Sequence, residues 1–106
     1  MSKIPKALLA EILADPYYKT CAREGTDCDG RITLEHALYY AGKQLQEKYA
    51  IIPLCVYHHL VPGLQKRTNQ AIAYSRATDE DLQKYPKLSI PHARAIQKLF
   101  LPAKVL

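Results

Sequence analysis

Three cysteines and a nearby histidine are the residues that most constrain how this chain of 106 residues can fold. Cys21, Cys28, Cys55 and His58 offer three thiolates and one imidazole, a ligand set typical of structural zinc. Cys55 and His58 have the spacing by which one helical turn brings two ligands to one side, whereas the gap between Cys21 and Cys28 is wider than usual. The alternative is that the cysteines are unrelated thiols, with Cys55 a small buried hydrophobe. We predict zinc, because all four residues fit one tetrahedral set.

Length and composition indicate a single domain spanning residues 1–106. A second independent core in so short a chain would be too small to offset the entropy of ordering it. The chain is 48% hydrophobic and 24% charged, which argues against intrinsic disorder. It has no apolar run of about 18 residues that could span a membrane, and its first residues lack the pattern of a secretory signal. We therefore expect a cytoplasmic protein with no membrane association, in which the cysteines stay reduced.

The net charge favours a nucleic-acid partner. Fifteen Lys and Arg against ten Asp and Glu give +5, and basic side chains release counterions when they neutralise phosphates. Lys66 and Arg67 directly follow the histidine segment, so they are the basic pair best placed to contact a phosphate backbone. The sequence does not decide whether the nucleic acid is DNA or RNA. It also does not fix the oligomeric state, for which a dimer is one option.

The pattern of apolar residues and turn formers predicts a mostly helical α+β fold. A small β-hairpin plus helix, a zinc core of ββα-metal or treble-clef-like type, is expected within 17–63, with flanking N-terminal and C-terminal helices, the latter in 64–106. The expected elements are helices over 6–13, 36–50, 55–61, 69–77, 79–85 and 90–101, a strand over 31–34 and an extended piece over 51–54. Thr68 or Asn69 is expected to cap the helix over 69–77, and Thr78 with Asp81 to form a capping box for the next helix.

Glu35, His36 and His59 are candidates for chemistry. A lone histidine on an apolar face is usually a packed core residue, but here a Glu-His pair ends a strand and His59 directly follows the proposed ligand His58. In a helix the side chains of His58 and His59 point about 100° apart, so one can bind zinc while the other faces a cleft. Metal-assisted phosphodiester hydrolysis needs a cation on the phosphate and a neutral imidazole that takes a proton from water.

The order of these residues resembles a known family. "Cys…Cys-x6-Glu-His…Ile-Pro-Leu-Cys-x2-His-His", over residues 21–60, looks like the zinc-containing form of the HNH endonuclease family, of the ββα-metal nuclease superfamily. The resemblance implies that His36 is the general base, while Glu35 and His59 hold a catalytic magnesium, manganese or nickel ion. It also implies that the three cysteines and His58 hold structural zinc. The expected function is a metal-dependent DNA endonuclease or nickase.

Two departures from the family pattern keep other functions open. Ala50 stands where the family has an asparagine, and residues 36–50 favour helix where many members have a glycine-rich loop, which suggests a divergent, phage-type branch. Asn69 is a further candidate ligand by its side-chain type alone. The alternatives are a non-catalytic zinc module that binds nucleic acid or a protein, and a metal-free helical DNA-binding protein with buried cysteines.

Overall fold

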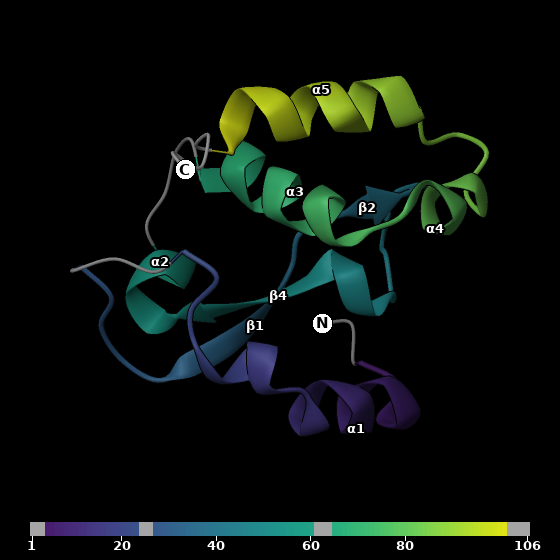
Figure 1. Ribbon diagram of the computed structural model, residues 1–106. Helices are drawn as coiled ribbons and strands as arrows, with labels where there is room; N and C mark the ends of the chain where they lie inside the picture. Colours follow the sequence, from purple (N-terminus) through teal and green to yellow (C-terminus); the bar gives the residue numbers. More distant parts are fainter. Residues whose placement is uncertain (1–3, 24–26, 61–64, 102–106) are drawn as a thin grey trace.

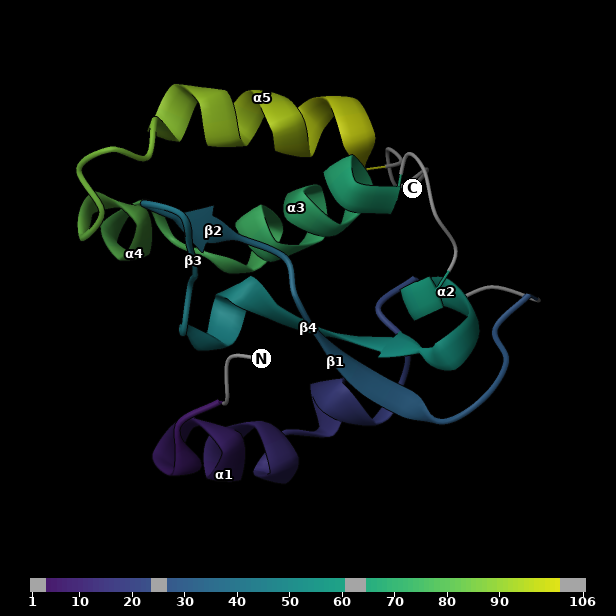
Figure 2. The same cartoon turned by 180° about the vertical axis from the view of Figure 1, so that it is seen from behind.

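The β1–β4 ribbon lies in the middle of the molecule, with helices on both sides (Figures 1 and 2). The computed structural model describes residues 4–23, 27–60 and 65–101. Its elements are α1 (Lys6–Ala14), the 3-10 helix η1 (Pro16–Lys19), β1 (Ile32–His36), β2 (Tyr39–Tyr40), β3 (Lys43–Gln44), the 3-10 helix η2 (Lys48–Ala50), β4 (Ile51–Cys55), α2 (Val56–Leu60), α3 (Gln65–Arg76), α4 (Asp79–Gln83) and α5 (Ile90–Phe100). Helix α1 lies on one side of the ribbon, and α3 with α5 on the other (Figure 1). Over the described ranges, no helix is long and apolar enough to cross a membrane.

Strands β1 and β4 with helix α2 form the β-hairpin plus helix that the sequence predicts. The strands are antiparallel and run in register from Ile32 opposite Cys55 to His36 opposite Ile51. Strand β1 therefore extends two residues beyond the predicted strand and includes the Glu-His pair. Pro53 lies within β4, but its carbonyl accepts a hydrogen bond from the backbone N–H of Ala22 at 2.7 Å, on the side away from β1. Its missing N–H therefore costs no ladder hydrogen bond.

Residues 36–50 do not form the predicted helix. Two short strands, β2 and β3, pair antiparallel through a two-residue turn at Ala41 and Gly42, whose φ angles are +52° and +80°. Positive φ at both central residues is typical of the turn that joins strands most tightly, and glycine adopts it without strain. The high helix propensity of Ala, Gln, Glu and Lys in this segment is overridden by this turn and by the burial of its apolar residues.

The C-terminal helices cover one face of the hairpin and form most of the core. Ile52 and Leu54 of β4 are fully buried against residues of α3, and Leu82, Ala93 and Ile96 extend the same cluster toward α4 and α5. The Thr78–Asp81 capping box of α4 is confirmed, since each side chain accepts a hydrogen bond from the other residue's backbone N–H. The predicted caps at Thr68 and Asn69 are wrong, because α3 already begins at Gln65 and both residues lie inside it.

Tyr18 connects the N-terminal segment to the rest of the fold. It forms a second buried cluster with Ile12 and Ile51, and its hydroxyl lies 2.7 Å from the carbonyl oxygens of Lys48 and Ile51. Arg76 of α3 donates to the same hydroxyl at 2.7 Å. The burial of the Tyr18 ring raises the pKa of its hydroxyl, although the bound guanidinium acts in the opposite direction. One side chain thus fixes η1 against both β4 and α3.

Candidate functional site

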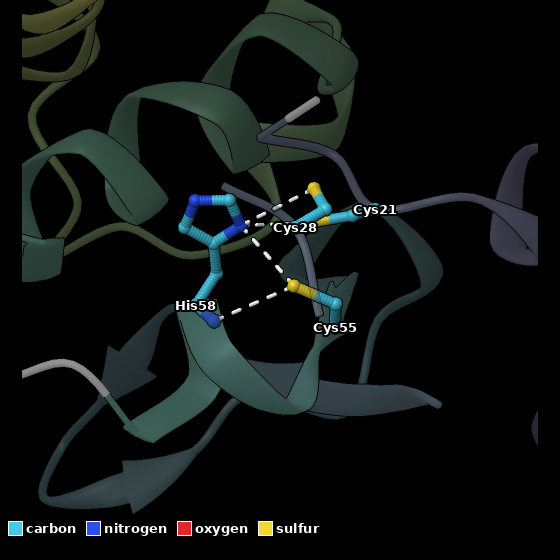
Figure 3. A group of neighbouring side chains, drawn as sticks. All are labelled: Cys21, Cys28, Cys55 and His58. Carbon is cyan, nitrogen blue, oxygen red and sulfur yellow. Dashed lines mark hydrogen bonds between the residues drawn. The ribbon is translucent and has the colours of Figure 1, made fainter. Parts of the chain in front are cut away.

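Cys21, Cys28, Cys55 and His58 converge on one point (Figure 3). Their four ligand atoms lie within 4.8 Å of one another. The three Sγ atoms lie 3.3, 3.5 and 3.3 Å from the Nδ1 atom of His58, in the order of the cysteines along the chain. A tetrahedral zinc site with ordinary zinc–sulfur and zinc–nitrogen bonds has sulfur–nitrogen edges of about 3.6 Å. The four residues are therefore close enough to hold one metal ion, and the spacing suits zinc.

The chemistry of the His58 ring also favours a metal ion. A neutral imidazole nitrogen has either one proton or one lone pair, so hydrogen bonding alone cannot satisfy three sulfur atoms around Nδ1. The opposite ring atom, Nε2, lies 3.2 Å from the Oδ1 atom of Asp27. A proton donated from Nε2 to this carboxylate leaves the lone pair on Nδ1, directed at the three thiols. A carboxylate behind a histidine ligand is a common second-shell arrangement in metal sites.

Gly30 helps to bring Cys28 close to the other three ligands. This residue has φ of +86°, and a Cβ atom added to it would lie 2.8 Å from the Cβ of Val56. Glycine therefore allows the segment that carries Cys28 to pass directly against the start of α2, where the backbone N–H of Tyr57 donates to the Asp29 carbonyl at 3.0 Å. Cys28 therefore lies next to Cys55 at the end of β4 and His58 in α2.

The environment of Cys55 favours the thiolate form that metals bind. Cys21, Cys55 and His58 are 5%, 2% and 4% exposed, whereas Cys28 lies at the surface, so the cluster is buried at three ligands and reaches solvent at the fourth. Burial raises the pKa of Cys55, but hydrogen bonds from the backbone at His58 and Asp29 and contacts with the other two thiols outweigh it and lower that pKa to about 6. The backbone N–H of Arg23 donates to the sulfur of Cys21 at 3.4 Å.

Glu35 and His59 form a second, more open pair beside this centre. Their side chains are 35% and 33% exposed, and Oε1 of Glu35 lies 3.7 Å from Nε2 of His59. On the other side of the ring, Nδ1 lies 2.7 Å from the hydroxyl of Thr33, which itself donates to the Leu54 carbonyl at 2.9 Å. The hydroxyl has one proton, so it must accept the Nδ1 proton of His59. In the neutral ring, the lone pair of Nε2 therefore faces a carboxylate, an arrangement that a cation between the two would stabilise.

His36 lies at the end of β1 and contacts a different partner. Alternation along the strand places Glu35 on the same face as Thr33 and directs His36 to the other face. The Nε2 atom of His36 lies 3.0 Å from the Oε1 atom of Gln46, and both side chains are half-buried. The structure thus brings Glu35 close to His59 and gives His36 a hydrogen-bond partner that the sequence does not predict.

The remaining predicted residues lie on α3. Lys66 and Arg67 are exposed in its first turn, and Arg67 donates to the side chain of Gln70 at 3.1 Å. Asn69 is 6% exposed, and within the described part of the chain its Oδ1 atom has no hydrogen-bond partner. Asn69 is therefore buried where α3 packs against the core.

Sequence reasoning missed three residues that support the site: Asp27, Thr33 and Gln46. Thr33 lies two residues before Glu35, so strand periodicity alone could have placed both on one face. Asp27 directly precedes the predicted ligand Cys28, which could have drawn attention to it. Nothing in the sequence around Gln46 indicates a role in the site. The assignment of these residues rests on their geometry, since the chain matches no protein-family model, no curated protein and no solved structure.

Proposed function

We propose that the protein is a metal-dependent endonuclease or nickase of HNH type, which hydrolyses phosphodiester bonds in DNA. One observation carries the proposal: Glu35 of β1 and His59 of α2 face each other at 3.7 Å, near a cluster in which Cys55 and His58 come from the same hairpin and helix and two further cysteines come from the segment before β1. This combination is the one that the HNH motif over residues 21–60 implies. A metal ion bound by the three cysteines and His58 would stabilise the hairpin and helix. The more exposed Glu35–His59 pair would perform the chemistry.

Glu35 and His59 are suited to hold a hard or borderline cation such as magnesium, manganese or nickel. A carboxylate oxygen and a neutral imidazole nitrogen converge there, and Thr33 fixes the ring so that Nε2 is the free ligand atom. A divalent cation held by these two side chains would supply charge stabilisation for the phosphate and the leaving oxygen. The partial exposure of both side chains would let a phosphodiester reach the pair.

His36 is suited to take a proton from the attacking water. With Nε2 hydrogen-bonded to Gln46, the Nδ1 atom keeps a lone pair for the proton. In-line attack requires the water and the leaving oxygen to lie on opposite sides of phosphorus. A base and a cation on different faces of the strand end are compatible with this requirement, because the scissile phosphate would lie between them.

Basic side chains would hold the DNA. The net charge of +5 favours binding to a polyanion, and Lys66 and Arg67 are exposed at the start of α3. Contacts of this kind neutralise phosphates and position the duplex without reading its sequence.

A plasmid assay tests the proposal. We expect zinc-loaded protein to convert supercoiled plasmid to the nicked or linear form when magnesium, manganese or nickel is added, and to leave it intact when the divalent cation is omitted. Parallel incubation with a labelled RNA decides which nucleic acid is preferred. Intact plasmid with every one of these cations would contradict the proposal.

A zinc module that binds without cutting is the second candidate. Ala50 favours it, because this fully buried residue offers no polar side chain where the HNH motif has an asparagine. A gel-shift measurement on the same plasmid samples separates the two functions. Retarded but intact DNA supports the binding module.

A further inference from the structure

We propose that Gln46 is a positioning residue for His36, which sets the orientation and the tautomer of the imidazole. The inference rests on the proposed function only for its effect on cleavage, because the contact itself belongs to the fold. Gln46 lies ten positions after His36 in the chain, between β3 and η2, and its side chain contacts the imidazole at 3.0 Å.

The contact determines where the proton of His36 is. Oε1 of Gln46 is an amide oxygen, which can only accept, so the Nε2 atom of His36 must carry the proton across the 3.0 Å contact. The lone pair of the neutral ring is then on Nδ1. Without this partner, the neutral ring would distribute its proton between both nitrogens, and only part of the molecules would have Nδ1 ready to accept.

The backbone around Gln46 is held on both sides, so its side chain can act as a fixed support. Leu45 is 4% exposed, and its N–H donates to the Leu38 carbonyl at 3.0 Å. On the other side, the Ala50 carbonyl accepts from the N–H of Ala37 at 2.8 Å. The segment thus folds back along the end of β1. The backbone of Ala50 fastens the loop, and the side chain of Gln46 contacts the imidazole.

The same contact would also assist proton transfer. When the ring accepts a proton at Nδ1 it becomes positively charged, and its Nε2–H then donates a charge-assisted hydrogen bond to the amide oxygen, which is stronger than the neutral one. Gln46 would therefore support the ring before and after the transfer.

Long-range proton–nitrogen NMR of the histidine rings tests the tautomer directly, with His36→Ala used to assign the signals. We expect neutral His36 in the zinc-loaded wild type to carry its proton on Nε2. We expect Gln46→Met, which keeps the length but removes the acceptor, to give a mixture of tautomers, and Gln46→Glu, which keeps an acceptor oxygen, to retain the Nε2–H form. A wild-type ring with its proton on Nδ1, or a tautomer unchanged in Gln46→Met, would overturn the inference.

Cleavage kinetics test the consequence. Gln46→Met should lower kcat by about 10-fold or more with little change in KM, because a misplaced base slows the chemical step without weakening DNA binding. Gln46→Glu should recover most of the rate. Gln83→Met, a change of the same kind at an exposed position of α4, should match the wild type.

The two proposals fail in different ways. If Gln46→Met raises KM and leaves kcat unchanged, Gln46 contacts DNA and does not position the base. If the wild type cleaves no DNA but the tautomer shifts as expected, the positioning contact is upheld and the nuclease function is refuted.

Discussion

Replacement of Cys55 by serine is expected to abolish the stable fold. Cys55 is 2% exposed at the junction of β4 and α2, and its sulfur is one of the four atoms through which a metal ion would join the segments after η1, before β1 and in α2. Structural zinc contributes an apparent free energy of about 10–16 kcal/mol, which equals or exceeds the total of about 5–15 kcal/mol for an ordinary domain. Elemental analysis should find one zinc per wild-type chain and almost none in Cys55→Ser, whose circular-dichroism melt should lose its cooperative transition.

A matched control separates metal loss from the cost of a buried hydroxyl. Ala71→Ser adds the same group at a fully buried position of α3, a helix that carries none of the four clustered residues. It should lower the free energy of unfolding by about 1–3 kcal/mol and keep the full zinc content. A cooperative Cys55→Ser melt near that of the wild type, with no zinc in either protein, would show that the cysteines are simply buried thiols.

Replacement of His36 by alanine is expected to reduce the rate of DNA cleavage by at least about 100-fold, the lower range for loss of a general base. His36 is half-buried at the end of β1 and is not among the four clustered ligands, so zinc content and melting temperature should change little. Single-turnover cleavage of a labelled duplex measures the effect without interference from product release.

His92→Ala is the control for the loss of an imidazole elsewhere. His92 is exposed on α5, and it is the backbone N–H of this residue that hydrogen-bonds to Ser89, so the change should leave the rate unaltered. Full activity in His36→Ala would remove His36 from the mechanism and leave the cation pair without its proposed base.

The sequence predicts the four clustered ligands well, because ligand chemistry depends on residue type more than on exact spacing. Cys55 and His58 were identifiable from the strand-to-helix junction alone. The gap between Cys21 and Cys28 was harder to interpret, since its closure depends on the close approach of Gly30 to the start of α2, which is a tertiary contact. The capping box of Thr78 and Asp81 is also predictable from sequence, because both of its residues lie within one helical turn.

Residues 36–50 were mispredicted for a physical reason. Their composition favours helix, but the strands around Ala41 and Gly42 pair with each other, and Leu38 and Leu45 are buried on the core. Tertiary burial of this kind outweighs propensities of a few tenths of a kcal/mol per residue. The partnership of Gln46 with His36 depends on that fold, so no pattern in the chain could have indicated it.

The dependence of cleavage on manganese concentration tests most directly whether Glu35 and His59 hold the catalytic cation. Single-turnover rates are measured for the wild type and His59→Ala, both loaded with zinc, over a range of manganese concentrations. We expect the half-saturating manganese concentration to rise by about 10-fold or more in His59→Ala, since loss of a ligand costs at least as much as loss of its support. Equal half-saturating concentrations and equal rates in the two proteins would contradict a cation site at this pair.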